Sequence, residues 1–439
     1  MLRTTPNGCV FLLLYLSLSC VPAGAQTSRG GARSAAPGNS SKLTEIRVLG
    51  SQRFQQSEVV HATGLKPGDD GSEDALKRAA DRLAASGMFT DVTYRYVSGP
   101  EGTKAEFHVH DVDKLLPLRF DNFVWLPKEE LLTRLRQREP LFTGQVPNAG
   151  EMFQKLTEDI KSVLADLHVS AEVTAFPQVP LGGSEVVAFL YKVEGVKLPI
   201  RDVRFEGASH EMEGVLQHSA AAALIGSDYS ETKVGAVSAL DFLPQYRMRG
   251  YLKAAFGSPA ATLQDPAGGA VALQLPVQEG SVYGLAAIHW TGNAAFPSKE
   301  LARVIRAQPG KPLNQVEFEE DVRAISKIYG TQGYMEARPK PDYVFDDPGQ
   351  KVTVEVTVRE GDRYRMGAVR FEGLGENSRA ILTKLWALRP DDFYDSSYPQ
   401  TFMTTASRQF DFSALKVQFN ERLNRENKTV DVVWRFSAK

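Results

Sequence analysis

Two histidines that lie close together are the residues whose types and spacing come nearest to a catalytic or metal-binding motif. They belong to the segment His108-Val109-His110-Asp111-Val112-Asp113. On a strand, residues two apart point to one face, so the two imidazoles could chelate a metal ion. The other histidines are scattered along the sequence, at His61, His168, His210, His218 and His289. We therefore favour the alternative interpretation, that His108 and His110 are exposed polar positions of a strand, and we expect no metal or other cofactor.

Other catalytic motifs are missing from the sequence. There is no Gly-x-Ser-x-Gly segment, and both cysteines, Cys9 and Cys20, lie in the N-terminal leader. No glycine-rich run precedes the Lys/Ser helix start of a phosphate loop. Acidic pairs such as Asp391-Asp392 are interpreted as solvated turn positions rather than acid/base pairs. We predict that the protein is not an enzyme; a secreted metal-dependent hydrolase using His108 and His110 stays as an alternative.

Composition and charge are those of a folded protein with several domains. The chain has 439 residues, of which 42% are hydrophobic and 24% charged. A chain of this length is too long for one ordinary core. The formal net charge is only -2, so no basic field attracts nucleic acid, and no nucleic-acid partner is expected.

The N-terminus has the pattern of a signal peptide. Arg3 precedes an apolar run from Val10 to Val21, and Ala23-Gly24-Ala25 supplies the small residues of a cleavage site. Lipid attachment at Cys20 is not favoured, because Ser17 stands where a lipobox prefers a large aliphatic residue. We predict export of the chain and cleavage after Ala25.

The rest of the chain is a repeat. Three pairs of glycines are each twelve residues apart, Gly195 with Gly207, Gly280 with Gly292 and Gly361 with Gly373. The segments Ile46 to Gly50 and Leu118 to Asn122 match the second half of this pattern, and we expect Asn122 to replace glycine in a left-handed backbone conformation. The predicted domains are a signal peptide (1–25), a flexible linker (26–42) and five repeats (43–113, 114–195, 196–280, 281–361 and 362–439), of which the second is divergent.

Each unit is predicted to have the element order βααββ. In the first unit the expected elements are a strand over Glu45–Leu49, a helix over Gln56–Ala62, a helix from Ser72 to Gly87, and hairpin strands over Val92–Val97 and Ala105–Val109. In the fourth unit the first helix is expected from Ser298 to about Ala307. The predicted fold class is α+β, an elongated array of tandem βααββ repeats.

These repeats resemble a known family of domains. A βααββ unit whose second helix is followed by Gly250-Tyr251 or Gly333-Tyr334, with Glu-Gly before the next strand, is similar to the POTRA (polypeptide-transport-associated) domain. Five such units behind a signal peptide resemble the periplasmic arm of the BamA outer-membrane assembly factor family. The resemblance covers Lys42 to Lys439. No membrane β-barrel is expected within this sequence.

The resemblance implies a role and a binding mode. It implies a periplasmic scaffold, peripherally associated with the outer membrane through a partner, that binds unfolded outer-membrane proteins or envelope assembly components. Binding would occur by strand addition to the first strand of each hairpin. The residues expected to bind are Asp91, Val92, Thr93, Tyr94, Arg95, Tyr96 and Val97 in the first repeat, and Lys253, Ala254, Ala255 and Phe256 in the third.

The fourth repeat is less favoured for strand addition than the first and third. In the fourth repeat, Pro339 and Pro341 lie on the same strand of the hairpin and are expected to blunt main-chain pairing there. A structural adaptor that binds a folded envelope partner, without handling unfolded clients, is the main alternative function.

Overall fold

The computed structural model describes residues 42–439 except 181 and 266–268. The predicted signal peptide, the linker up to residue 41 and both cysteines lie outside these residues. The chain divides into two compact units, one ending at Val196 and the other beginning at Lys197. Among the described residues, no helix is long and apolar enough to cross a membrane.

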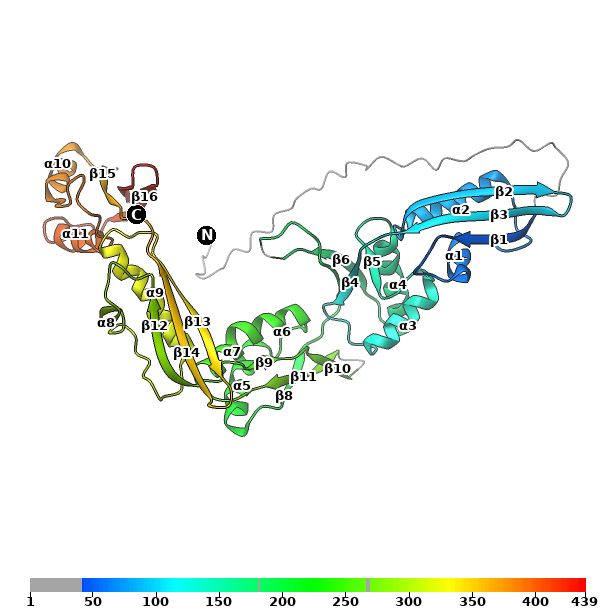
Figure 1. The fold of residues 1–439 in the computed structure, drawn as a ribbon, viewed down its shortest axis with the longest axis horizontal. Coiled ribbons are helices and arrows are strands. Elements are labelled where there is room, and N and C mark those ends of the chain that lie inside the picture. Colours follow the sequence, from blue (N-terminus) through cyan, green and yellow to red (C-terminus); the bar gives the residue numbers. More distant parts are fainter. Residues whose placement is uncertain (1–41, 181, 266–268) are drawn as a thin grey trace. The chain divides into compact units, whose positions relative to one another are not determined.

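The first repeat is a three-stranded sheet with two helices on one face (Figure 1). Its elements are β1 (Leu43–Leu49), α1 (Gln56–Thr63), α2 (Glu73–Ala85), β2 (Phe89–Gly99) and β3 (Gly102–Asp111). The strand order is β1-β3-β2, with β1 parallel and β2 antiparallel to the central strand β3. Ser72 begins α2 by accepting a hydrogen bond from the Ala75 backbone N–H, and buried Leu76 and Leu83 fix its inner face. The predicted α+β fold is confirmed.

The second repeat shares its hydrophobic core with the first and has one extra strand. Its elements are β4 (Leu115–Phe120), α3 (Lys128–Arg138), β5 (Gln145–Pro147), α4 (Met152–Asp166), β6 (Glu172–Gln178) and β7 (Ala188–Glu194). The strand order is β5-β4-β7-β6. After α4, His168 adopts φ +60°, the left-handed conformation that Gly87 takes after α2. A histidine thus replaces the glycine that ends the second helix in other repeats.

The third repeat departs from the predicted element order in its helices and its hairpin. Its elements are β8 (Ile200–Glu206), α5 (His210–Ala223), α6 (Glu231–Val237), the π-helical turn η1 (Ser238–Phe242), α7 (Leu243–Arg247), β9 (Ala255–Phe256), β10 (Ala260–Asp265) and β11 (Ala270–Gln278). Pro244 has no N–H to donate to the preceding turn, and the Leu243 N–H bonds to Ser238, five residues back.

The predicted edge of the third sheet needs correction. Lys253 and Ala254 lie before β9 rather than in a strand, and only Ala255 and Phe256 pair with the central strand β11. The edge continues as β10, which pairs with β11 after a break at Gly257 to Pro259. Lys253, before β9, instead contacts Asp347 and Phe345 of the following repeat.

The fourth and fifth repeats return to the simple order. Their elements are β12 (Gly284–Thr291), α8 (Ser298–Leu301), α9 (Gln315–Thr331), β13 (Arg338–Asp346), β14 (Lys351–Arg359), β15 (Arg365–Glu372), α10 (Glu376–Leu385), α11 (Tyr398–Ala406), β16 (Leu415–Asn424) and β17 (Thr429–Ala438). The sheets have the orders β12-β14-β13 and β15-β17-β16.

Helix α8 is shorter than predicted, since it ends at Leu301 instead of about Ala307. The backbone N–H and the guanidinium Nε of Arg306 both donate to the carboxylate of Asp321 on α9, each at 2.8 Å. These bonds hold the end of the segment in a non-helical path, which local helix propensity does not reveal.

The boundary glycines pack tightly against the central strands. A Cβ at Gly50, Gly207, Gly292 or Gly373 would collide with the carbonyl oxygen of Val109, Val277, Val358 or Phe436, and each glycine has φ between +74° and +104°. Only glycine tolerates this combination of close approach and left-handed backbone. The same position in every one of these repeats therefore joins the first strand to the last.

Asn122 occupies the equivalent position in the second repeat. The expectation that its backbone adopts the left-handed conformation was wrong. It is not among the described residues with positive φ. Its side-chain Nδ2 donates to the Val193 carbonyl at 2.9 Å, and its Oδ1 accepts from the Val193 N–H at 2.8 Å. The Asn122 side chain thus links the end of the first strand to the central strand. In the other repeats this link is made by the close backbone packing of the glycine.

This packing predicts different costs for two glycine substitutions in the fourth repeat. Gly292 and Gly310 have φ of +74° and +81°, but only Gly292 has a carbonyl in the way of a Cβ. Gly310→Ala should lower the free energy of unfolding by about 1–2 kcal/mol, the cost of the left-handed backbone. Gly292→Ala should lower it by clearly more, because the strand pair must also separate. Urea unfolding of both variants checks this, and equal losses would contradict the close packing.

Candidate functional site

The outer edge of the first strand is bonded near its start in every repeat. In the first repeat, the Leu43 N–H bonds to the Asp69 carbonyl and the Gly68 N–H bonds to the Leu43 carbonyl, at 2.8 and 2.7 Å. The same exchange joins Ile200, Leu285 and Met366 to their own turns, and β5 covers β4 in the second repeat. At these residues the outward N–H and C=O groups of the first strand are already taken, which leaves the opposite edge as the better candidate for an added strand.

The opposite edge of each sheet is the first strand of the hairpin. Strands β2, β6, β10, β13 and β16 lie at this end of their sheets and each pair with the neighbouring strand on one side, whereas the strands at the other end also bond to the turn or, in β4, to β5. Their outward N–H and C=O groups can accept a further strand. All seven predicted residues from Asp91 to Val97 lie in β2, and Ala255 and Phe256 lie in the short β9.

Strand β2 is the longest of these edges and contains no proline. Its eleven residues run antiparallel to β3, with one register shift near Phe89. On the helix side, the Tyr94 ring lies 6.0 Å from Phe107, and the Tyr96 hydroxyl donates to Glu73 at 3.2 Å. On the open side, Val97 is 73% exposed, an unusual position for a valine. The strand is anchored by one face and offers its edge and open face to solvent.

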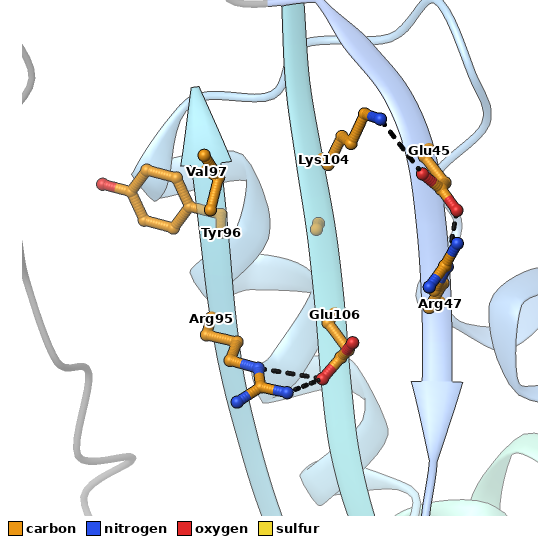
Figure 2. Close-up of a pocket in the computed structure, with 8 residues that line it drawn as sticks. Glu45, Arg47, Arg95, Tyr96, Val97, Lys104 and Glu106 are labelled. Atoms are coloured by element: carbon orange, nitrogen blue, oxygen red, sulfur yellow. Dashed lines mark hydrogen bonds and ion pairs between the residues drawn. The ribbon is translucent and has the colours of Figure 1, made fainter. Parts of the chain in front are cut away.

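A shallow depression of about 360 Å³ lies on the open face beside this edge (Figure 2). Arg95 on β2 and Arg47 on β1 are both in register with Glu106 on the central strand. The Arg95 Nε donates to Glu106 Oε1 at 2.8 Å, whereas Arg47 pairs with Glu45. The hydrogen bonds from Arg95 hold the pKa of the Glu106 carboxyl below its ordinary value, and His108 adds to the effect. The open face therefore carries a fixed pattern of charges next to the exposed valine.

The two histidines of the possible metal motif lie on this open face. His108 Nε2 is 2.7 Å from Glu106 Oε1, and His110 is exposed. No group of three histidine, cysteine, aspartate or glutamate side chains suited to a metal is found in residues 42–439 outside the gaps.

Asp111, beside these histidines, has a structural role that sequence analysis missed. Its carboxylate accepts hydrogen bonds from the Ser51 hydroxyl and from the Gln52 and Arg53 N–H groups, at 2.8 to 2.9 Å. Glu279 and Glu360 bind the equivalent loops through Ser209 and Ala295. The Glu-Gly boundary in the sequence was the available signal for this carboxylate, and Asp111 replaces it in the first repeat.

Lys253 joins two repeats instead of forming an edge. Its Nζ pairs with Asp347 Oδ1 at 2.5 Å and lies 4.6 Å from the centre of the Phe345 ring. The Tyr283 hydroxyl donates to the same carboxylate at 2.7 Å. Hydrogen bonds from Lys253 and Tyr283 lower the pKa of Asp347. Lys253 thus belongs to the contact between the third and fourth repeats.

Strand β13 differs from β2 in its backbone. Its register with β14 continues unbroken through Pro339 and Pro341. Prolines are tolerated in an edge strand where the nitrogen points away from the ladder. The outer edge of β13 thereby lacks two N–H donors that β2 retains.

Parts of this chain are similar to proteins and domains that are already known. Residues 283–361, which contain β12 to β14, match the POTRA family model, described as a surface antigen variable number repeat. BamA of Neisseria meningitidis serogroup B is 26% identical over 179 residues, 37% of this chain and 22% of that protein. BamA of Neorickettsia risticii is 20% identical over 371 residues, 81% of this chain and 48% of that protein. The chain spans less than half the length of these relatives.

One of the solved structures that this chain matches is BamA POTRA3-5 of Haemophilus influenzae. It is 20% identical, covers 54% of this chain and 95% of its own, and has a TM-score of 0.41. Together with the match at residues 283–361, the relatives confirm the resemblance inferred from the repeat boundaries.

The charge pattern beside β2 predicts how one substitution changes a titration. Replacing Arg95 by glutamine removes the first cause of the low pKa of Glu106, so this pKa should rise toward its ordinary value. Carbon-detected NMR titration of the Glu106 carboxyl measures the change. Arg47→Gln is the matched control, because Arg47 is in register with Glu106 but bonds to Glu45. An equal rise in both variants would contradict the pairing.

Proposed function

We propose that this chain, a POTRA-domain protein similar to the BamA assembly factors, takes part in outer-membrane protein assembly by binding extended polypeptide segments. The segments would add as a further strand to the outer edge of β2. The observation that supports this most directly is the edge itself, eleven residues paired on one side only among the described strands. The opposite edge of the same sheet is closed at Leu43 by the turn.

Strand addition suits a varied set of clients. Affinity comes from main-chain hydrogen bonds, which every extended segment can make, and side-chain contacts add a modest preference. The exposed Val97 offers an apolar contact to an added strand, and Arg95 beside it is fixed by Glu106. Cross-strand pairs of this kind contribute roughly 0.2–1 kcal/mol each. Weak, sequence-tolerant binding fits a transient role in assembly.

The proposed setting is the periplasm, at the outer membrane. The partners would be unfolded outer-membrane proteins or components of the envelope assembly machinery. The names of the relatives support this setting, since they are outer-membrane protein assembly factors. Edge residues Ala255 and Phe256, with β10, are a second and shorter place for strand addition in the third repeat.

Photocrosslinking in the producing cell tests this proposal. A photoreactive residue at Arg95 should capture many different outer-membrane proteins, because an added strand lies about 5 Å from β2. The same residue at Arg47 is the matched control, since it occupies the same level and face but lies two strands further away. It should capture several-fold less.

Other outcomes of that experiment would change the assignment. A single folded envelope protein captured at Arg95 would favour a structural adaptor over a client-binding arm. Equal capture from Arg47 and Arg95 would contradict addition at the β2 edge.

A proline in β2 tests the main-chain mechanism itself. Pro341 lies opposite Val356, and Tyr94 lies opposite Phe107. These two pairs occupy equivalent positions in their sheets. In each sheet the residue two further along the central strand, Val358 or Val109, places its carbonyl next to the boundary glycine. Tyr96 is two residues from Tyr94, so its N–H points outward as well. Tyr96→Pro should therefore remove one outward donor, and capture at position 95 should fall several-fold below that of Tyr96→Ala.

The alanine variant separates the two effects of the proline. Both substitutions remove the hydroxyl contact with Glu73, but only proline removes the N–H. Thermal unfolding of the two proteins checks that the sheet is retained. Equal capture by the two variants would contradict binding through the backbone.

A further inference from the structure

Two arginines face each other on the open side of the fourth sheet. Arg338 on β13 and Arg359 on β14 are direct cross-strand partners, and both side chains are exposed. Like charges placed directly opposite each other destabilise an antiparallel pair. The arrangement therefore costs the free protein some stability.

Neighbouring carboxylates do not neutralise the two arginines. Asp342 pairs with Lys340 at 2.8 Å, and Glu355 bonds to His289 at 2.8 Å. In the described part of the chain, neither Arg338 nor Arg359 has an ion pair with a carboxylate within 4 Å. Within the described residues, the two arginines therefore lack a direct ion-pair partner.

The arginines line a depression of about 450 Å³. Lys340, Asp342 and Thr357 complete its lining, so three cationic side chains face one carboxylate that is already paired. Guanidinium groups bind carboxylates in a bidentate, planar geometry, which favours this ligand chemistry. An incoming carboxylate would also relieve the repulsion between the two arginines.

We propose that this surface, the Arg338–Arg359 pair with Lys340, binds carboxylates of an acidic segment of a partner polypeptide. A polypeptide is favoured over a free anion because the same face of β13 continues to Val344, which is 57% exposed. That valine would take an apolar side chain of the same segment. The prolines of β13 remove outward N–H donors, so contact here relies on side chains. This binding is independent of strand addition at β2.

The test uses the purified protein and a fluorescent peptide rich in aspartate and glutamate with one leucine. Binding is followed by fluorescence anisotropy at low and at physiological ionic strength. We expect Arg338→Gln and Arg359→Gln each to weaken binding about tenfold, since each removes charge-assisted hydrogen bonds. Arg323→Gln is the matched control, an exposed arginine on α9 in the helical layer, and it should leave the affinity within twofold.

The stability of the variants provides a second readout. Arg359→Gln removes the cross-strand repulsion, so it should unfold at the same or a higher temperature than the unaltered protein while binding less peptide. Lower stability together with weaker binding would point to a structural role and overturn the proposal. Equal weakening by Arg323→Gln, absence of peptide binding, or binding of inorganic phosphate without binding of the peptide would also overturn it.

Discussion

The exchange of main-chain hydrogen bonds between the first strand and the turn after the first helix is the interaction on which the binding properties of these sheets depend. At Leu43, Ile200, Leu285 and Met366 this exchange occupies the outward N–H and C=O groups near the start of one sheet edge. A strand that is already bonded on both sides cannot accept another. The parallel pairing of first and last strands then puts the hairpin's first strand at the remaining edge. The hairpin's first strand is thus the sheet edge that lacks these bonds to the turn, and its position follows from the connection rather than from the side chains on it.

Main-chain hydrogen bonds also join successive repeats within a compact unit. The Tyr283 N–H bonds to the Gly250 carbonyl, and the Tyr364 N–H bonds to the Gly333 carbonyl, at 2.8 and 2.7 Å. A glycine at the end of the second helix is required because Tyr364 approaches the Gly333 Cα too closely for a side chain. The charged cluster of Lys253 and Asp347 lies beside the first of these joints. Helix termination and the joint to the next repeat are therefore one structural feature.

Much of the fold could be predicted from the sequence because it rests on local rules. Alternation and glycine spacing placed the strands, and Ser72 correctly marked the start of a helix. The failures involve partners distant in sequence. Asn122 binds Val193, 71 residues away, and Lys253 binds Asp347, 94 residues away. Propensity and periodicity contain no information on such pairs, so the expected left-handed Asn122 and the expected strand at Lys253 were both wrong.

The binding edges show the same division between local pattern and tertiary context. Residues Asp91 to Val97 could be placed on an edge strand, because alternation marked them as the first strand of the hairpin and the resemblance to the POTRA domain implies that this strand is the edge. The unpaired arginines on the fourth sheet could not, since Arg338 and Arg359 become neighbours only through the register of β13 with β14. In β2 the free groups include an uninterrupted row of backbone atoms, whereas in β13 two prolines remove N–H donors and unpaired charged side chains lie on the open face. Under the two proposals, repeats with one topology recognise different features of a partner, its extended backbone in one case and its acidic side chains in the other.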